Sequence, residues 1–243
     1  MGKVLVAINP RNLALTSDLQ PKVAPYMYTI NWWFLENGGR LHPKIVATYG
    51  AVHSASQQAL TTNIKSVAYH PQFSEKTFFN DIAILKTAEE IQLSAVVRPI
   101  CINLDPADWT GKEVTVAGWG IQKPGRKTRV WTLFYAEMKP SEKLRYTKLT
   151  VLSQAECKTK LKLYNFDENT MICAFQEDTD ACKGDSGSGL THSNGRQVTQ
   201  IAIVSHGVGC AEGLPGVYTS VHKFKEWIRS TVEGDKGFKD LSN

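Results

Sequence analysis

The sequence predicts an all-β fold that ends in a single α-helix. Two observations carry this prediction: short runs rich in β-branched residues alternate with turn signals along most of the 243 residues, and one amphipathic segment lies near the C-terminus. Many short strands at such spacing are typical of a sandwich or a barrel. The expected strands cover residues 26–30, 44–48, 64–69, 82–85, 113–117, 146–152, 197–205 and 216–221.

The expected helix covers residues 221–232, because apolar side chains recur there at helical spacing. Its apolar face consists of Phe224, Trp227, Ile228 and Val232. The segment after it, 233–243, is polar and is expected to fray.

The composition is that of an ordinary globular protein. A hydrophobic content of 42% and a charged content of 21% fit a chain that buries a sizeable core. No apolar run approaches the length that spans a bilayer, so no membrane segment is expected. The net charge of +5 is mild, and the six histidines lack paired ligand spacing. We therefore expect no nucleic-acid partner, no cofactor and no metal.

The segment 180–190, Asp-Ala-Cys-Lys-Gly-Asp-Ser-Gly-Ser-Gly-Leu, places one serine among small residues. A nucleophilic serine needs backbone N–H groups directed at the oxyanion, and glycine lets the backbone approach that closely. Ser186 is therefore the candidate nucleophile. With Asp180 six residues and Cys182 four residues before that serine, the segment resembles the nucleophile segment of the trypsin/chymotrypsin family of serine proteases.

Other segments resemble the same family in the same order along the chain. They are residues 79–85, 116–120, 205–210 and 215–219. The resemblance extends over a domain at about 13–232, with tails at 1–12 and 233–243. It implies a chymotrypsin-like double β-barrel, with barrels at about 13–105 and 106–220, a C-terminal helix at 221–232 and an active site in the cleft between the barrels.

The resemblance implies catalytic roles for three residues. Ser186 would be the nucleophile, and the N–H groups of Gly184 and Ser186 would form the oxyanion hole. Asp81 would orient a histidine and support its charge.

The resemblance also implies a specificity pocket for a basic side chain. Asp180 would bind the Arg or Lys side chain of a peptide or protein ligand through charge-assisted hydrogen bonds. Ser205, Gly207 and Gly216 would line this pocket. His206, where relatives usually carry Trp, would line the substrate cleft.

The general base is missing from its expected place. The family's chain order is His, Asp, Ser, so the base must precede Asp81, which leaves His42, His53 and His70. The sequence around each of them is typical of an exposed turn, and His53 is the one that we retain as a candidate general base. The interval before Asp81 is short for the family, which indicates a deletion near the junction of Thr48 and Tyr49 and an abridged first barrel.

Three interpretations follow from this missing base. The first is a catalytically silent or very slow protease homologue that binds its partners through the old substrate cleft. The second is an active endopeptidase that cleaves after Arg or Lys with His53 as an unconventional base. The third is a truncated product whose first barrel is too incomplete to fold.

The N-terminal region also departs from the resemblance. Active relatives expose an Ile-Val-Gly-Gly end whose ammonium pairs with the aspartate before the serine, here Asp185. A cut after Arg11 would expose Asn12, which suits such insertion poorly. We therefore expect Asp185 to lack its cation.

The chain has five cysteines. The resemblance implies the disulfides Cys157–Cys173 and Cys182–Cys210, and it leaves Cys101 unpaired and available to a disulfide partner chain. Disulfides persist in oxidising compartments, so we expect an extracellular protein, although residues 1–10 do not read as a signal peptide.

Overall fold

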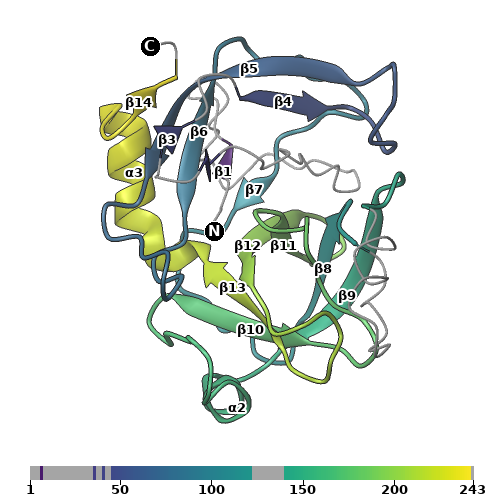
Figure 1. The fold of residues 1–243 in the computed structure, drawn as a ribbon, viewed down its shortest axis with the longest axis vertical. Helices are drawn as coiled ribbons and strands as arrows, with labels where there is room; N and C mark the ends of the chain where they lie inside the picture. The colour runs from purple at the N-terminus through teal and green to yellow at the C-terminus, as the bar shows by residue number, and fades with distance from the viewer. Residues whose placement is uncertain (1–5, 8–34, 37–39, 42–44, 122–139, 242–243) are drawn as a thin grey trace.

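The computed structural model describes residues 6–7, 35–36, 40–41, 45–121 and 140–241. Two β-sheet systems lie one above the other in Figure 1, and the C-terminal helix runs along the side of the upper one. The fold is mostly β and is consistent with the predicted chymotrypsin-like class. No helix in these ranges is long and apolar enough to cross a membrane.

The lower system is a closed barrel of six strands, in the order β11-β8-β9-β10-β13-β12, with β12 pairing back onto β11. β7 (Cys101–Ile102) adds to it, parallel to β12. The six strands are β8 (Glu113–Gly118), β9 (Arg145–Val151), β10 (Met171–Phe175), β11 (Gly189–Ser193), β12 (Val198–His206) and β13 (Gly216–Ser220). Inward apolar side chains such as Val116, Leu149, Leu190 and Ile201 fill this barrel.

The upper system has five strands among the described residues, and they do not close into a ring. β5 is its centre, because it pairs with three other strands. The strands are β1 (Val6–Ala7), β4 (Val46–Tyr49), β5 (Leu60–Tyr69), β6 (Ala83–Thr87) and β14 (Lys239–Asp240), and a separate hairpin joins β2 (Leu35–Glu36) to β3 (Arg40–Leu41). β4 runs unbroken through Thr48 and Tyr49, where the deletion is expected.

The predicted helix is confirmed, with shifted bounds. It begins as a 3-10 turn, η2 (Val221–Phe224), and continues as α3 (Lys225–Gly234). Phe224 and Ile228 are buried against Ile84 of the upper sheet and Ile203 of the lower barrel. The apolar face of the helix therefore holds the two β systems together.

The prediction that the C-terminal tail frays is wrong. Lys239 and Asp240 form β14 and pair antiparallel with Val67 and Ser66 of β5. Leu241 donates its N–H to Lys65 O at 3.0 Å and buries its side chain in the upper core. A polar composition concealed this strand, since one buried leucine supplies most of its apolar contact.

Leu241→Ala should lower the free energy of unfolding by about 2–4 kcal/mol, because a buried leucine leaves a cavity when it is truncated. Leu163→Ala is the matched control, since the side chain of Leu163 is 82% exposed and its loss should change stability by less than about 0.5 kcal/mol. Urea unfolding followed by tryptophan fluorescence measures both. Equal effects would contradict the packing of Leu241, and the absence of a cooperative transition would favour the truncated-product interpretation.

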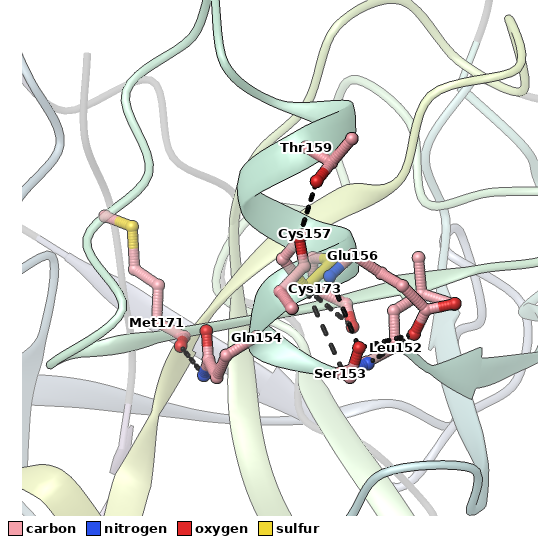
Figure 2. The surroundings of a disulfide bond; sticks show 9 residues. Leu152, Ser153, Gln154, Glu156, Cys157, Thr159, Met171 and Cys173 are labelled. Carbon is pink, nitrogen blue, oxygen red and sulfur yellow. Dashed lines mark hydrogen bonds between the residues drawn. A yellow bond between two sulfur atoms is a disulfide. The ribbon is translucent and has the colours of Figure 1, made fainter.

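Helix α2 (Gln154–Lys160) starts with a capping box between Ser153 and Glu156. Figure 2 shows this helix fastened to β10 by the disulfide Cys157–Cys173. Ser153 Oγ accepts the N–H of Glu156, and the Glu156 carboxylate accepts the N–H of Ser153. Two donors at the start of the helix are thus satisfied locally.

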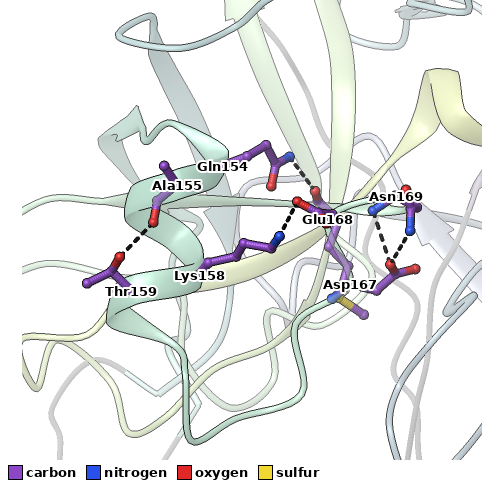
Figure 3. A network of polar contacts seen from close by, with 8 residues as sticks. Gln154, Ala155, Lys158, Thr159, Asp167, Glu168 and Asn169 are labelled. Atoms are coloured by element: carbon purple, nitrogen blue, oxygen red, sulfur yellow. Dashed lines mark hydrogen bonds and ion pairs between the residues drawn. The ribbon is translucent and has the colours of Figure 1, made fainter.

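A polar network fixes the loop that follows α2 (Figure 3). Lys158 pairs with Glu168 at 2.6 Å, and Asp167 accepts hydrogen bonds from Asn169 and Thr170. This loop carries Asn165, whose backbone carbonyl contacts the site described next.

Candidate active site

The loop that carries Ser186 is a series of tight turns between Cys182 and β11. Asp185 N–H donates to Cys182 O at 2.9 Å, and Gly187 N–H donates to Val204 O of β12 at 2.9 Å. Gly184 and Gly187 have φ values of +100° and +86°, which only glycine adopts without strain. In the described part of the chain, the Ser186 hydroxyl has no hydrogen-bond partner.

The carboxylate of Asp185 points back under this loop. It accepts the N–H of Gly120 at 2.7 Å and that of Cys182 at 3.0 Å. It also fills the space in which a Cβ of Gly118 or Gly120 would lie, so both positions require glycine. Burial raises the pKa of Asp185. Within the described ranges no cation pairs with this carboxylate, and Arg11 and Asn12 lie outside them.

The residues expected to form the pocket lie together. A Cβ on Gly216 would lie 3.0 Å from Asp180 Oδ1, and a Cβ on Gly207 would lie 3.9 Å from the Gly216 Cα. The disulfide Cys182–Cys210 joins the nucleophile loop to the segment that carries Gly207. Tyr218 and Asp180 therefore fill the place of a Cβ at Gly216, so that position requires glycine.

Asp180 and Tyr218 are the side chains that lie against Gly216. Asp180 Oδ1 accepts the N–H of Ala181 at 2.8 Å, but burial prevails and raises the pKa of Asp180 to about 6. The Tyr218 hydroxyl is fully buried and has no partner among the described residues, and burial raises its pKa. A Cβ on Gly216 would lie 2.9 Å from that hydroxyl. Sequence reasoning missed Tyr218, since a tyrosine in a buried strand reads as core.

Asp81 lies just before β6 and is 2% exposed. Ser205 Oγ lies 2.6 Å from its Oδ2, and Thr219 Oγ1 donates to its backbone carbonyl at 2.9 Å. Burial raises the pKa of Asp81 to about 6, although the hydrogen bond from Ser205 acts in the opposite direction. Ser205, which was expected only to line the pocket, thus contacts the aspartate directly.

No imidazole is hydrogen-bonded to Asp81 or Ser186 in the described ranges. His53 is exposed on a loop whose backbone bridges to Lys143. His70 packs against Phe224 and Trp227 and accepts the N–H of Gln72, and burial lowers its pKa. His42 lies outside the described residues.

Comparison with known proteins identifies the family. The trypsin family model matches residues 37–228, which is most of the chain. The chain belongs to the trypsin family. It is 32% identical to trypsin beta of Drosophila erecta over 176 residues, which cover 71% of this chain and 63% of the relative. It is also 32% identical to trypsin alpha of Drosophila melanogaster over 180 residues, which cover 73% and 64%.

A third relative is serine protease filzig of Drosophila melanogaster, which is 32% identical over 182 residues. That match covers 72% of this chain and 10% of the relative. The trypsin-family chain thus spans less than two thirds of the length of each of these three relatives.

The expected disulfides of this trypsin-family chain are confirmed. Cys157 bonds to Cys173 and Cys182 bonds to Cys210. Cys101 is free and half-buried, and the Gln197 side chain donates to its Sγ at 2.8 Å.

Proposed function

We propose that this trypsin-family chain binds Arg and Lys side chains in its cleft but cleaves peptide bonds very slowly or not at all. The observation that carries the proposal is the environment of Asp81. Its carboxylate contacts Ser205, and no described imidazole is hydrogen-bonded between it and Ser186. Among the described residues, the aspartate is thus present without the base that it should orient.

A serine hydroxyl attacks a carbonyl only when a base removes its proton. Without the histidine, the oxyanion hole and substrate binding leave a residual acceleration of about 10³–10⁴ over water. Gly184 and Ser186 would still supply the oxyanion donors, and Ser186 would still be in place. The chemistry therefore supports slow acyl transfer at most.

Recognition of a basic side chain rests on Asp180. A carboxylate held in a largely apolar recess selects a cation, because a charge-assisted hydrogen bond offsets its burial. A Cβ on Gly207 would meet no atom closer than 3.9 Å, which supports room for a long side chain beside it.

Benzamidine binding and ester hydrolysis test the two halves of this proposal separately. Calorimetry should detect benzamidine binding to the unmodified chain and to Ser186→Ala, and Asp180→Asn should weaken it by at least about tenfold. Arginine esters should show no turnover above a Ser186→Ala control, and a fluorophosphonate should label Ser186 slowly. Fast labelling or turnover would overturn the silent site, and equal binding by Asp180→Asn would overturn the pocket.

The same assay tests the active-enzyme alternative. His53 is exposed and makes no side-chain hydrogen bond within the described ranges, so it would have to move into the cleft to act as a base. Any turnover that His53→Ala abolishes would establish that alternative.

We propose that the protein acts outside the cell, since both disulfides persist in an oxidising compartment. The free thiol of Cys101 could bond to a partner chain, which non-reducing electrophoresis of protein from its natural source would detect.

A further inference from the structure

Three side chains form a continuous polar line from the buried aspartate to the cleft wall. Asp81 Oδ2 lies 2.6 Å from Ser205 Oγ, which lies 3.0 Å from His206 Nδ1. His206 Nε2 lies 2.9 Å from the carbonyl oxygen of Asn165. The ring of His206 stacks on Phe78, with centroids 4.9 Å apart and planes inclined by 28°. The imidazole is therefore held at both nitrogens and on one face.

The hydrogen bonds along this line require a definite number of protons. A carbonyl oxygen only accepts, so His206 Nε2 must carry a proton. If Nδ1 is bare, Ser205 must donate to it, and Asp81 must then be protonated to donate to Ser205. If Asp81 is ionised, Ser205 donates to it, and Nδ1 must carry a proton and donate to Ser205.

Both arrangements contain one more proton than the serine hydroxyl and the Nε2–H group supply. We propose that Asp81, Ser205 and His206 form one hydrogen-bonded chain that holds a single extra proton, with His206 in place of a triad histidine as the ionisable partner of Asp81. Water supplies this proton, which shifts between the two ends through the Ser205 hydroxyl.

The surroundings of Asp81 and His206 favour a proton that is shared between these two side chains. Burial raises the pKa of Asp81 to about 6 and lowers the pKa of His206, so burial disfavours the charged form at both ends of the line. The segments packed against His206 present the Phe78 ring and the Asn165 carbonyl, and neither is ionisable. Within the described ranges, no other charged side chain bonds or pairs with Asp81, Ser205 or His206.

His206 acts in this arrangement as a positioning residue. Through Ser205 it shares a proton with the Asp81 carboxylate, which would otherwise be charged and buried. Its contacts with Phe78 and Asn165 hold its own ring in place. The inference does not depend on the rate at which Ser186 reacts.

Nitrogen-15 NMR of the histidine rings in the unmodified protein is the first test. At high pH, neutral His206 should be the Nε2–H tautomer, and at low pH it should share a proton with Asp81. The Nδ1–H tautomer would overturn the proposal without any mutation.

Substitutions are the second test. In Asp81→Asn, the amide donates to Ser205, which donates to Nδ1, so the line needs no extra proton. The proton dissociation constant of His206 should then rise by at least about tenfold. In Ser205→Ala the bridge is absent and only the Coulomb attraction between the two ends remains, so adding Asp81→Asn should change that constant by clearly less than it does when Ser205 is present.

The resonances of His192, which lies in β11 of the lower barrel, should be the same in every variant and serve as the internal control. An unchanged His206 titration in Asp81→Asn would overturn the proposal. An equal response to Asp81→Asn with and without Ser205 would also overturn it, because the coupling would then not pass through the hydroxyl.

Discussion

Asp81→Asn should stabilise the protein above pH 7 by about 3 kcal/mol. Burial raises the pKa of this carboxyl from 3.8 to about 6, and a displacement of that size corresponds to about 3 kcal/mol. Between pH 3.8 and about pH 6, the folded state binds more protons than the unfolded state. The stability of the unmodified protein must therefore fall as pH rises through about 6. Asparagine carries no charge, so the variant avoids that loss.

Urea unfolding at pH 4.5 and pH 8 measures this effect. The free energies of unfolding of the two proteins should differ little at pH 4.5 and most at pH 8. Asp180 keeps part of the pH dependence in the variant, since its pKa is also raised to about 6. Asp108→Asn is the control with the opposite sign, because backbone and side-chain hydrogen bonds from Thr110 lower the pKa of that exposed carboxyl. An Asp81→Asn variant that is less stable at every pH would contradict the assignment.

Removing the Cys182–Cys210 disulfide, as the double alanine variant, should abolish benzamidine binding and lower the free energy of unfolding by about 3–4 kcal/mol. The bond closes a loop with a sequence separation of 28, and a loop of that length predicts a loss of this size. The effect on binding has a geometric cause. Cys210 holds the wall that carries Gly207 against the loop that carries Asp180.

The other disulfide provides the matched control. Cys157 and Cys173 have a sequence separation of 16, and their replacement by alanine should cost about 3 kcal/mol. That bond fastens α2 to β10, where Cys173 pairs with Val217 next to Gly216. Because it does not join the segment of Gly207 to the loop of Asp180, the benzamidine affinity of the folded fraction should fall less than in the Cys182–Cys210 variant. Calorimetry and urea unfolding on the two double variants give both quantities. Equal loss of binding in both variants would show that the pocket depends on global stability and not on its own disulfide.

The fold was predictable where the local pattern was strong. Seven of the expected strands correspond to β4, β5, β6, β8, β9, β12 and β13, and the strand expected at 26–30 lies outside the described residues. β11 escaped prediction because Gly189 opens it and polar residues end it. Helix α2 could have been found, since Ser153 and Glu156 have the spacing of a capping box.

The pairing of β14 with β5 could not be predicted from the sequence around either strand. The pairing joins positions more than 170 residues apart, and only the tertiary fold brings them together. The same holds for the contact between Asp81 and Ser205, which are separated by 124 residues.

The sequence supplied candidate site residues but not the contacts between them. The resemblance assigned Asp180, Gly207 and Gly216 to one pocket, and the structure places these three residues near one another. The hydrogen bond between Ser205 and His206 joins neighbours in the sequence, yet nothing local indicates that the hydroxyl also reaches an aspartate. The unpaired hydroxyl of Tyr218 depends on the packing of a complete barrel.

The strand β14 has a consequence for biosynthesis. A ribosome makes the chain from its N-terminus, and domains usually fold in that order. The lower barrel has all six of its strands once Ser220 has emerged, whereas β5 of the upper sheet waits for Lys239 and Asp240. The half that is translated first should thus be the last to mature, since the edge of β5 at Ser66 and Val67 stays unpaired until β14 has been made.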